Sequence, residues 1–245
     1  MRLLDTTGGN PKLGKTARGG FDHGFGEIEG AAVTRARVAG LSLYPDAVLC
    51  AGSKAAGCMD DCLKGQGRGQ MDSVTEARQA KADWFYSDPY AFMVQLKGEL
   101  ENFRDTCRRS EAMPFVRLNV LSDIDWESYN VPQAFPELTF YDYTKRAARL
   151  GNTPDNYRLI FSYSGRAQYA GQVSRALKTL APVAVVFRGG LPARFLGRRV
   201  MDGDASDIAN FRAVGQIVGL RAKGTSARDN QNGFIIDNPE LLAVA

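Results

Sequence analysis

Three cysteines, Cys50, Cys58 and Cys62, crowd into one loop with the spacing Cys-x7-Cys-x3-Cys. Thiolates bind zinc and iron tightly, and three in one loop can converge on one ion or cluster without help from distant parts of the chain. Four cysteines are too few for a disulfide framework in 245 residues, which favours a ligand set in a reducing compartment. The spacing therefore predicts a metal or iron–sulfur site; three reduced thiols in a surface turn are the alternative.

A fourth ligand would decide between two chemistries. The only histidine, His23, lies in a glycine-rich segment, and Cys107 falls on an apolar helical stripe that predicts a core role. Zinc held by four protein ligands is structural, whereas three cysteines with an open position suit a substrate-binding iron–sulfur cluster. Radical S-adenosylmethionine enzymes place a cysteine loop after the first strand of a partial barrel, although with a different spacing. That analogy of topology makes S-adenosylmethionine a further candidate cofactor.

A second set of reactive side chains follows the ends of predicted strands. Its members are Asp123, Asp125, Asp142, Lys145, Ser162, Arg188 and Lys223. The carboxyl ends of parallel strands share one edge of a sheet, where active sites gather. Carboxylates beside lysines can shift each other's pKa toward acid–base catalysis, so we expect Asp123, Asp125, Asp142, Lys145 and Lys223 to be catalytic. The alternative is that Asp123 caps a turn and Asp142 pairs with Lys145 on the surface.

Arginines and glycines interleave between residues 188 and 199. Arginine forks and exposed glycine amides suit phosphate groups, so Arg188, Arg198 and Arg199, with Ser162, are predicted to bind the phosphates of a nucleotide or nucleic acid. A solvated basic loop balanced by neighbouring aspartates explains the same pattern equally well.

Residues 9–16 satisfy the phosphate-loop string G-x4-G-K-T. That motif works only between a core strand and a helix whose first turn meets the phosphates. Here Gly19, Gly20, Gly24 and Gly26 follow, which an ordinary helix would not carry. We therefore expect this string to be a decoy and residues 1–35 to form an irregular arm.

The elements that must position these residues alternate along the chain. Candidate strands are residues 41–44, 115–120, 138–141, 157–161, 183–187 and 216–220. A capping box of Ser73 and Glu76 predicts the start of one helix, and Asp88 before Pro89 predicts the start of a second. The pattern predicts a single α/β domain over residues 1–245 with a mainly parallel sheet of about six strands. An open or partial barrel is the preferred form, and a flat doubly wound sheet is the alternative.

Composition narrows the function classes further. Hydrophobic residues make up 44% of the chain, which is typical of a globular protein, and the net charge of +4 permits anionic partners without requiring them. Residues 1–10 have no apolar signal region, and no apolar run approaches the ~20 residues that span a bilayer. We therefore expect a cytoplasmic protein without a membrane partner. The oligomeric state cannot be read from the sequence.

Several short motifs occur together over nearly the whole chain. They are Gly9-Asn10-Pro11-Lys12, the cysteine loop with residues 63–69, Arg117-Leu118-Asn119, residues 122–124, 140–145, 156–157, 161–162 and 183–187, Asp202-Gly203-Asp204, and residues 219–224. As a set they resemble the gene product 88 family of bacteriophages. The resemblance implies a phage or mobile-element protein, acting in the cytoplasm of the host cell, and it implies no mechanism.

Two hypotheses follow. The first is an enzyme that uses a cysteine-bound metal or cluster beside the carboxylate and lysine residues, acting on a nucleotide or nucleic acid. The second is a non-catalytic nucleic-acid-binding protein whose cysteines hold a structural zinc ion. An open three-cysteine site beside the polar residues would favour the first, and a closed four-ligand site would favour the second.

Overall fold

The computed structural model describes residues 1–6, 27–28, 31–32, 35–59, 62, 67–223 and 231–239. His23 and the phosphate-loop string lie outside the described residues, as does most of the predicted arm. The prediction of an irregular arm is wrong at its start, because β1 (Leu4–Thr6) pairs antiparallel with β4 (Ala36–Leu41). Two further short strands, β2 (Glu27–Ile28) and β3 (Ala31–Ala32), pair only with each other.

Two long helices connect β4 to the next strand of the sheet. After the short elements α2 (Ser53–Ala56) and η3 (Gly67–Gln70) come α3 (Asp72–Ser87) and α4 (Pro89–Arg109). The predicted cap of α4 is confirmed, since the Asp88 carboxylate accepts a hydrogen bond from the amide of Ala91 at 2.9 Å. The predicted capping box of α3 is wrong: its N-cap is Met71, which makes no side-chain cap.

The main sheet has ten strands and is mostly parallel, as predicted, but it has more than the six strands expected. Its order is β1-β4-β5-β6-β7-β8-β11-β10-β9, with β12 also paired to β8. The further strands are β5 (Met113–Arg117), β6 (Thr139–Thr144), β7 (Tyr157–Ser162), β8 (Val183–Arg188), β9 (Arg194–Phe195), β10 (Arg198–Asp202), β11 (Ile217–Arg221) and β12 (Ile235–Asp237). The strand predicted at residues 41–44 ends at Leu41 instead. The sheet is open, since no described pairing joins its edges β1 and β9.

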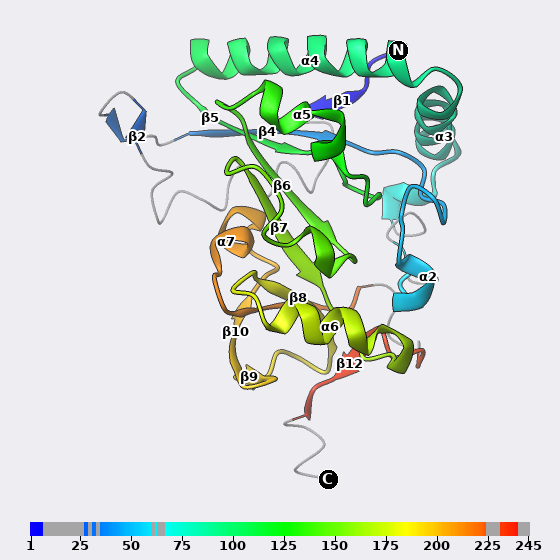
Figure 1. Cartoon of the computed structure of the whole chain (residues 1–245), viewed down its shortest axis with the longest axis vertical. Helices are drawn as coiled ribbons and strands as arrows, with labels where there is room; N and C mark the ends of the chain where they lie inside the picture. Colours follow the sequence, from blue (N-terminus) through cyan, green and yellow to red (C-terminus); the bar gives the residue numbers. More distant parts are fainter. Residues whose placement is uncertain are drawn as a thin grey trace.

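Helices cover the two faces of this sheet unequally. Strands β4 to β8 follow one another in chain order, and right-handed connections then lie on one face. That face carries α4 and α6 (Ala170–Leu177), as the shared cores show, and Figure 1 shows α4 beside β1 and β4 with α6 beside β8. The chain then reaches β10 before returning to β11, so their connection, α7 (Asp207–Arg212), packs on the opposite face.

Strand parity defines the core beneath α7. Every second residue of a strand points to this face, and β4, β5, β6, β7, β8 and β11 each contribute one buried apolar residue to the core that includes α7. The strand residues are Val38, Phe115, Tyr141, Ile160, Ala184 and Val218, and the α7 side chains are those of Ile208 and Phe211. The alternate residues of these strands point to the opposite face and pack against α3, α4 and α6. The sheet is therefore buried on both faces.

Strands β7 and β8 are staggered, so that the end of β7 pairs with the start of β8. They pair only at Phe161 with Val183 and at Ser162 with Ala184. Beyond that point β12 pairs with β8, where Ile235 lies opposite Val186 in parallel. A late segment of the chain therefore continues the sheet beside β8 beyond the end of β7.

Candidate functional site

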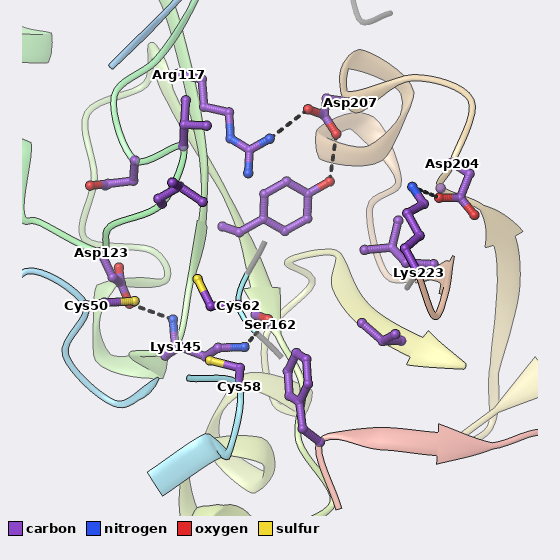
Figure 2. Close-up of a pocket in the computed structure, with 18 of the residues that line it drawn as sticks. Cys50, Cys58, Cys62, Arg117, Asp123, Lys145, Ser162, Asp204, Asp207 and Lys223 are labelled. Carbon is purple, nitrogen blue, oxygen red and sulfur yellow. Dashed lines mark hydrogen bonds and ion pairs between the residues drawn. The ribbon is translucent and has the colours of Figure 1, made fainter. Parts of the chain in front are cut away.

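A cavity of about 320 Å³ lies at the carboxyl ends of the parallel strands, on the same face as α7. On β5, β6, β7, β8 and β11, the residue two positions after the one in the core beneath α7 points to the same face and lines the cavity. Thus Phe115 is followed by Arg117, Tyr141 by Tyr143, Ile160 by Ser162, Ala184 by Val186 and Val218 by Leu220. Because the apolar core ends at the cavity, the polar side chains at these positions face a partly open space (Figure 2).

The cysteine loop borders this cavity. Cys50, Cys58 and Cys62 all line it, and each is half-buried. The loop after β4 begins with a turn held by Asp46, whose carboxylate accepts hydrogen bonds from the amides of Val48 and Leu49 at 2.7 Å. The three cysteines therefore share one cavity, but among the described residues they do not form a group that could hold one ion.

Two further contacts fix the loop against the sheet. The amide of Asp123 donates to the carbonyl of Leu49 at 2.7 Å, and the hydroxyl of Ser164 donates to the carbonyl of Ala56 at 2.7 Å. Gly57 ends α2 with a φ of 77°, a conformation that favours glycine. The cysteines thus stand on a segment anchored at both sides of α2.

Burial favours the protonated form of two of the thiols, those of Cys50 and Cys58. Desolvation, with smaller contributions from Cys58 and Asp123, raises the pKa of Cys50 to about 12. Desolvation also raises the pKa of Cys58, while the ammonium of Lys145 acts against the rise in both thiols. Lys145 is therefore the charge that favours thiolates in this part of the cavity.

The thiols do not have the spacing that one metal ion would require. Among the described residues, no three cysteine, histidine, aspartate or glutamate side chains are grouped closely enough to hold an ion. Two thiolates on one zinc ion lie about 3.8 Å apart, from a Zn–S bond of about 2.3 Å and tetrahedral angles. A cluster of four irons spreads its cysteine sulfurs further, because each sulfur binds a different iron.

Lys145 links the cysteines to the strand ends. Its side chain is 7% exposed, and its ammonium donates to the hydroxyl of Ser162 and lies 4.4 Å from the centre of the Phe234 ring. Its own amide donates to the Asp123 carboxylate at 2.7 Å. Lys145, Ser162 and Asp123 were all predicted site residues, and the cavity brings them together.

Asp123 is held from behind by a buried arginine. Arg149 donates to Asp123 at 2.7 Å and forms further ion pairs at 2.8 Å with Asp125 and Glu127. Burial raises the pKa of the Asp123 carboxyl, and the guanidinium of Arg149 acts against that rise. One oxygen of the Asp123 carboxylate thus accepts a hydrogen bond from Arg149, and Asp123 also lines the cavity wall.

The opposite wall is built around Arg117. Its guanidinium donates to Asp207 at 3.0 Å and lies 4.8 Å from the centre of the Tyr143 ring. The hydroxyl of Tyr143 donates to the same carboxylate at 2.9 Å. Toward the mouth, Lys223 pairs with Asp204 at 2.7 Å. Figure 2 shows Arg117 and Asp207 on one side of the cavity and the three cysteines on another.

Five residues predicted from sequence lie outside this cavity. Asp142 is fully buried on the helix-covered face, where it accepts hydrogen bonds from Asn119 and Tyr157 at 2.8 Å. Asp125 is ion-paired with Arg146 and Arg149. The three predicted phosphate-binding arginines do not line the cavity. Arg188 pairs with Asp237, and Arg198 donates to the carbonyls of Leu177 and Thr179. Arg199 is exposed on β10.

Several lining residues were not predicted from sequence. Arg117, Tyr143, Asp204, Asp207 and Phe234 all face the cavity. For Arg117 and Tyr143 a signal exists, because each stands two residues after a buried aromatic residue of its strand. Phe234 lies near β12, a strand too short to be recognised from its pattern.

Fold and site together define an open-sheet α/β protein with a cysteine-lined cavity at the carboxyl ends of its parallel strands. The family model of gene product 88 matches residues 3–238, nearly the whole chain. The chain therefore belongs to the gene product 88 family, as its motifs predicted. No curated protein and no solved structure matches it. Among the described residues, no helix is long and apolar enough to cross a membrane.

Proposed function

We propose that this protein is an enzyme in which Cys50, Cys58 and Cys62 hold an iron–sulfur cluster at one end of the cavity. The proposed substrate is a small anionic molecule such as a nucleotide. One observation carries the proposal: the three cysteines share a cavity with Lys145 and Ser162, although β4 and β7 lie far apart in sequence. Cysteines that serve only to fill a core pack against apolar side chains, not beside an ammonium and a hydroxyl group.

Topology supports a cluster of the kind used in radical chemistry. The cysteine loop follows β4, the first of five parallel strands that lie in chain order, which resembles the partial barrel of radical S-adenosylmethionine enzymes. A cluster with three protein thiolates leaves one iron free to bind a substrate or cofactor such as S-adenosylmethionine. Among the described residues no three such side chains form a group that could hold one ion, so the cluster proposal rests on the shared cavity and on the order of the strands.

The remaining polar residues fit acid–base and binding roles. Lys145, at the cavity wall and in contact with Ser162, is the proposed proton donor or acceptor, and Asp123 holds the Lys145 backbone in place. Lys223 stands at the mouth, where it can attract anions. Asp142 and Asp125 have structural partners and no place in this proposal.

A structural zinc in a nucleic-acid-binding module has weaker support. Zinc would need a fourth protein ligand, and Cys107 is 1% exposed in the core of α4, away from the cavity. A cavity of about 320 Å³ also suits a small molecule better than a polymer.

Anaerobic purification tests the proposal directly. The protein should be coloured, with a broad visible absorption and with iron and acid-labile sulfide in equal amounts. Cys50→Ala, Cys58→Ala and Cys62→Ala should each remove the colour. Zinc without iron in the wild-type protein would support the structural-zinc alternative, and a colourless, metal-free protein that cannot be reconstituted would refute both.

A further inference from the structure

The guanidinium of Arg117 is buried, and its Nε donor is unused. Arg117 is 9% exposed, and among the described residues its guanidinium donates one hydrogen bond, from Nη1 to Asp207 at 3.0 Å. Its Nε atom is buried and has no hydrogen-bond partner among the described residues. A buried donor without a partner is costly, by about 1–3 kcal/mol or more when it belongs to a charged group. Such a group at a cavity wall is explained by a ligand that supplies the missing acceptor.

A second unpartnered group lines the same cavity. Ser206 is 3% exposed, and its hydroxyl has no hydrogen-bond partner among the described residues. It stands at the N-cap of α7 but does not cap that helix. Its neighbour in sequence, Asp207, is the residue that pairs with Arg117. The free hydroxyl therefore stands on the segment that holds the arginine.

The charges of the lining favour an anion. The described lining residues include four cations, Arg117, Lys145, Arg221 and Lys223, and three carboxylates, Asp123, Asp204 and Asp207. Asp123 is already paired with Arg149, which stands behind the wall. The side chains that line the cavity therefore carry an excess of positive charge.

We propose that Arg117 and Ser206 bind an oxyanion, the phosphate or carboxylate group of the molecule that occupies this cavity. An arginine offers paired N–H donors that match the two oxygens of such a group. The Asp207 pair and the Tyr143 ring hold the guanidinium in one orientation, so little freedom is lost on binding. Identifying this anion with the substrate rests on the proposed function, whereas the binding site itself does not.

The site can be tested with inorganic phosphate and malonate as separate probes. Each is titrated into the full-length protein as purified anaerobically, at constant ionic strength with chloride as the reference, and binding is followed by calorimetry. Phosphate, malonate or both should bind saturably at one site, and the tighter of the two identifies the oxyanion. No saturable binding of either anion would overturn the proposal.

Variants assign the binding to these residues. Arg117→Lys keeps a positive charge beside Asp207 but removes Nε, and it should weaken binding at least about tenfold. Ser206→Ala removes only an unpartnered hydroxyl, so it should fold normally and weaken binding about threefold. Ser42→Ala is the matched control, because Ser42 is also 3% exposed with an unpartnered hydroxyl but does not line the cavity. Binding unchanged in both cavity variants, or weakened equally in the control, would overturn the assignment.

The cysteine variants separate this site from the cluster. If Cys58→Ala loses iron and still binds the anion, the oxyanion site stands without help from the cluster. If the wild-type protein holds iron and binds neither anion, the oxyanion site is refuted and the cluster proposal is unaffected.

Discussion

The ammonium of Lys145 donates a hydrogen bond to the hydroxyl of Ser162 and lies 4.4 Å from the centre of the Phe234 ring. These residues come from the end of β6, the end of β7 and the segment before β12. One cation thus joins three separate parts of the cavity wall and faces the cysteine loop as well. Its charge is the one that acts against the raised thiol pKa values.

Alkylation of Cys50 in the metal-free protein should be very slow. A pKa of about 12 in place of 9.0 lowers the thiolate fraction at pH 8 by two to three orders of magnitude, and alkylation requires the thiolate. The rate should rise about tenfold per pH unit below that pKa. Peptide mass spectrometry after iodoacetamide treatment measures it.

Replacing Lys145 should slow the same reaction further. Lys145→Met removes the nearby positive charge, which raises the pKa values of Cys50 and Cys58. Lys178→Met, at an exposed position after α6, is the control and should change nothing. Rapid labelling of Cys50 at neutral pH in the folded protein would contradict this description of the loop.

Cys107→Ala should lower stability and leave metal content unchanged. Cys107 belongs to the buried face of α4 with Phe103 and Leu100, and truncating it costs about 1 kcal/mol in the free energy of unfolding. Urea unfolding and iron analysis of the same preparations provide the two readouts. Loss of metal in this variant would make Cys107 a ligand.

Asp142 should make stability depend on pH. Burial, opposed by Arg117 and by hydrogen bonds from Tyr157 and Asn119, raises its pKa from 3.8 to about 7. Between these values the folded protein holds a proton that the unfolded chain releases. This contribution to stability is present at low pH and is lost as pH rises toward 7, by up to about 1.4 kcal/mol per pH unit.

Asp142→Asn should remove that dependence, because an amide does not titrate in this range. The measurement is the free energy of unfolding of wild type and variant at about pH 5 and about pH 7. The difference between the two proteins should change between the two pH values, while effects of other titrating groups cancel. Identical pH profiles would show that Asp142 keeps an ordinary pKa.

Arg149→Met should destabilise the protein by about 3–5 kcal/mol, since it leaves Asp123 buried without its arginine. Arg149 is 5% exposed and pairs with three carboxylates. Arg146→Met is the comparison, because the Arg146 side chain is 30% exposed, pairs with Asp125 and lies 3.9 Å from the Asp123 carboxylate, and such a partly exposed pair is worth about 1 kcal/mol or less. Similar losses in the two variants, measured by urea unfolding, would be evidence against the buried network.

Strand parity explains which site residues could be predicted from the sequence. Lys145 and Ser162 were found because they end strands whose apolar cores are visible in the sequence. Asp142 was wrongly placed at the cavity, because it stands between Tyr141 and Tyr143, and successive side chains point to opposite faces. The same rule applied to Arg117, two residues after Phe115, would have placed it correctly.

Short edge strands mark the limit of the fold prediction. The continuous apolar run of β8 was identified, since a strand buried on both faces has this pattern. By contrast β1 has three residues and β9 has two, too few to show an alternation. Such strands form because a neighbouring strand offers unpaired backbone groups. The residues of the short strand itself therefore do not show that it will pair.

The place of β12 has a consequence for the order of events during synthesis. Proteins emerge from the ribosome from the N-terminus, and the strands from β4 to β11 are all made before β12. Until β12 arrives, the edge of β8 beyond Ala184 stays unpaired and the wall formed by Phe234 and Ile235 is missing. The wall of the cavity beside the cysteine loop is therefore incomplete until the segment with Phe234 and Ile235 has been made, after the strands from β4 to β11.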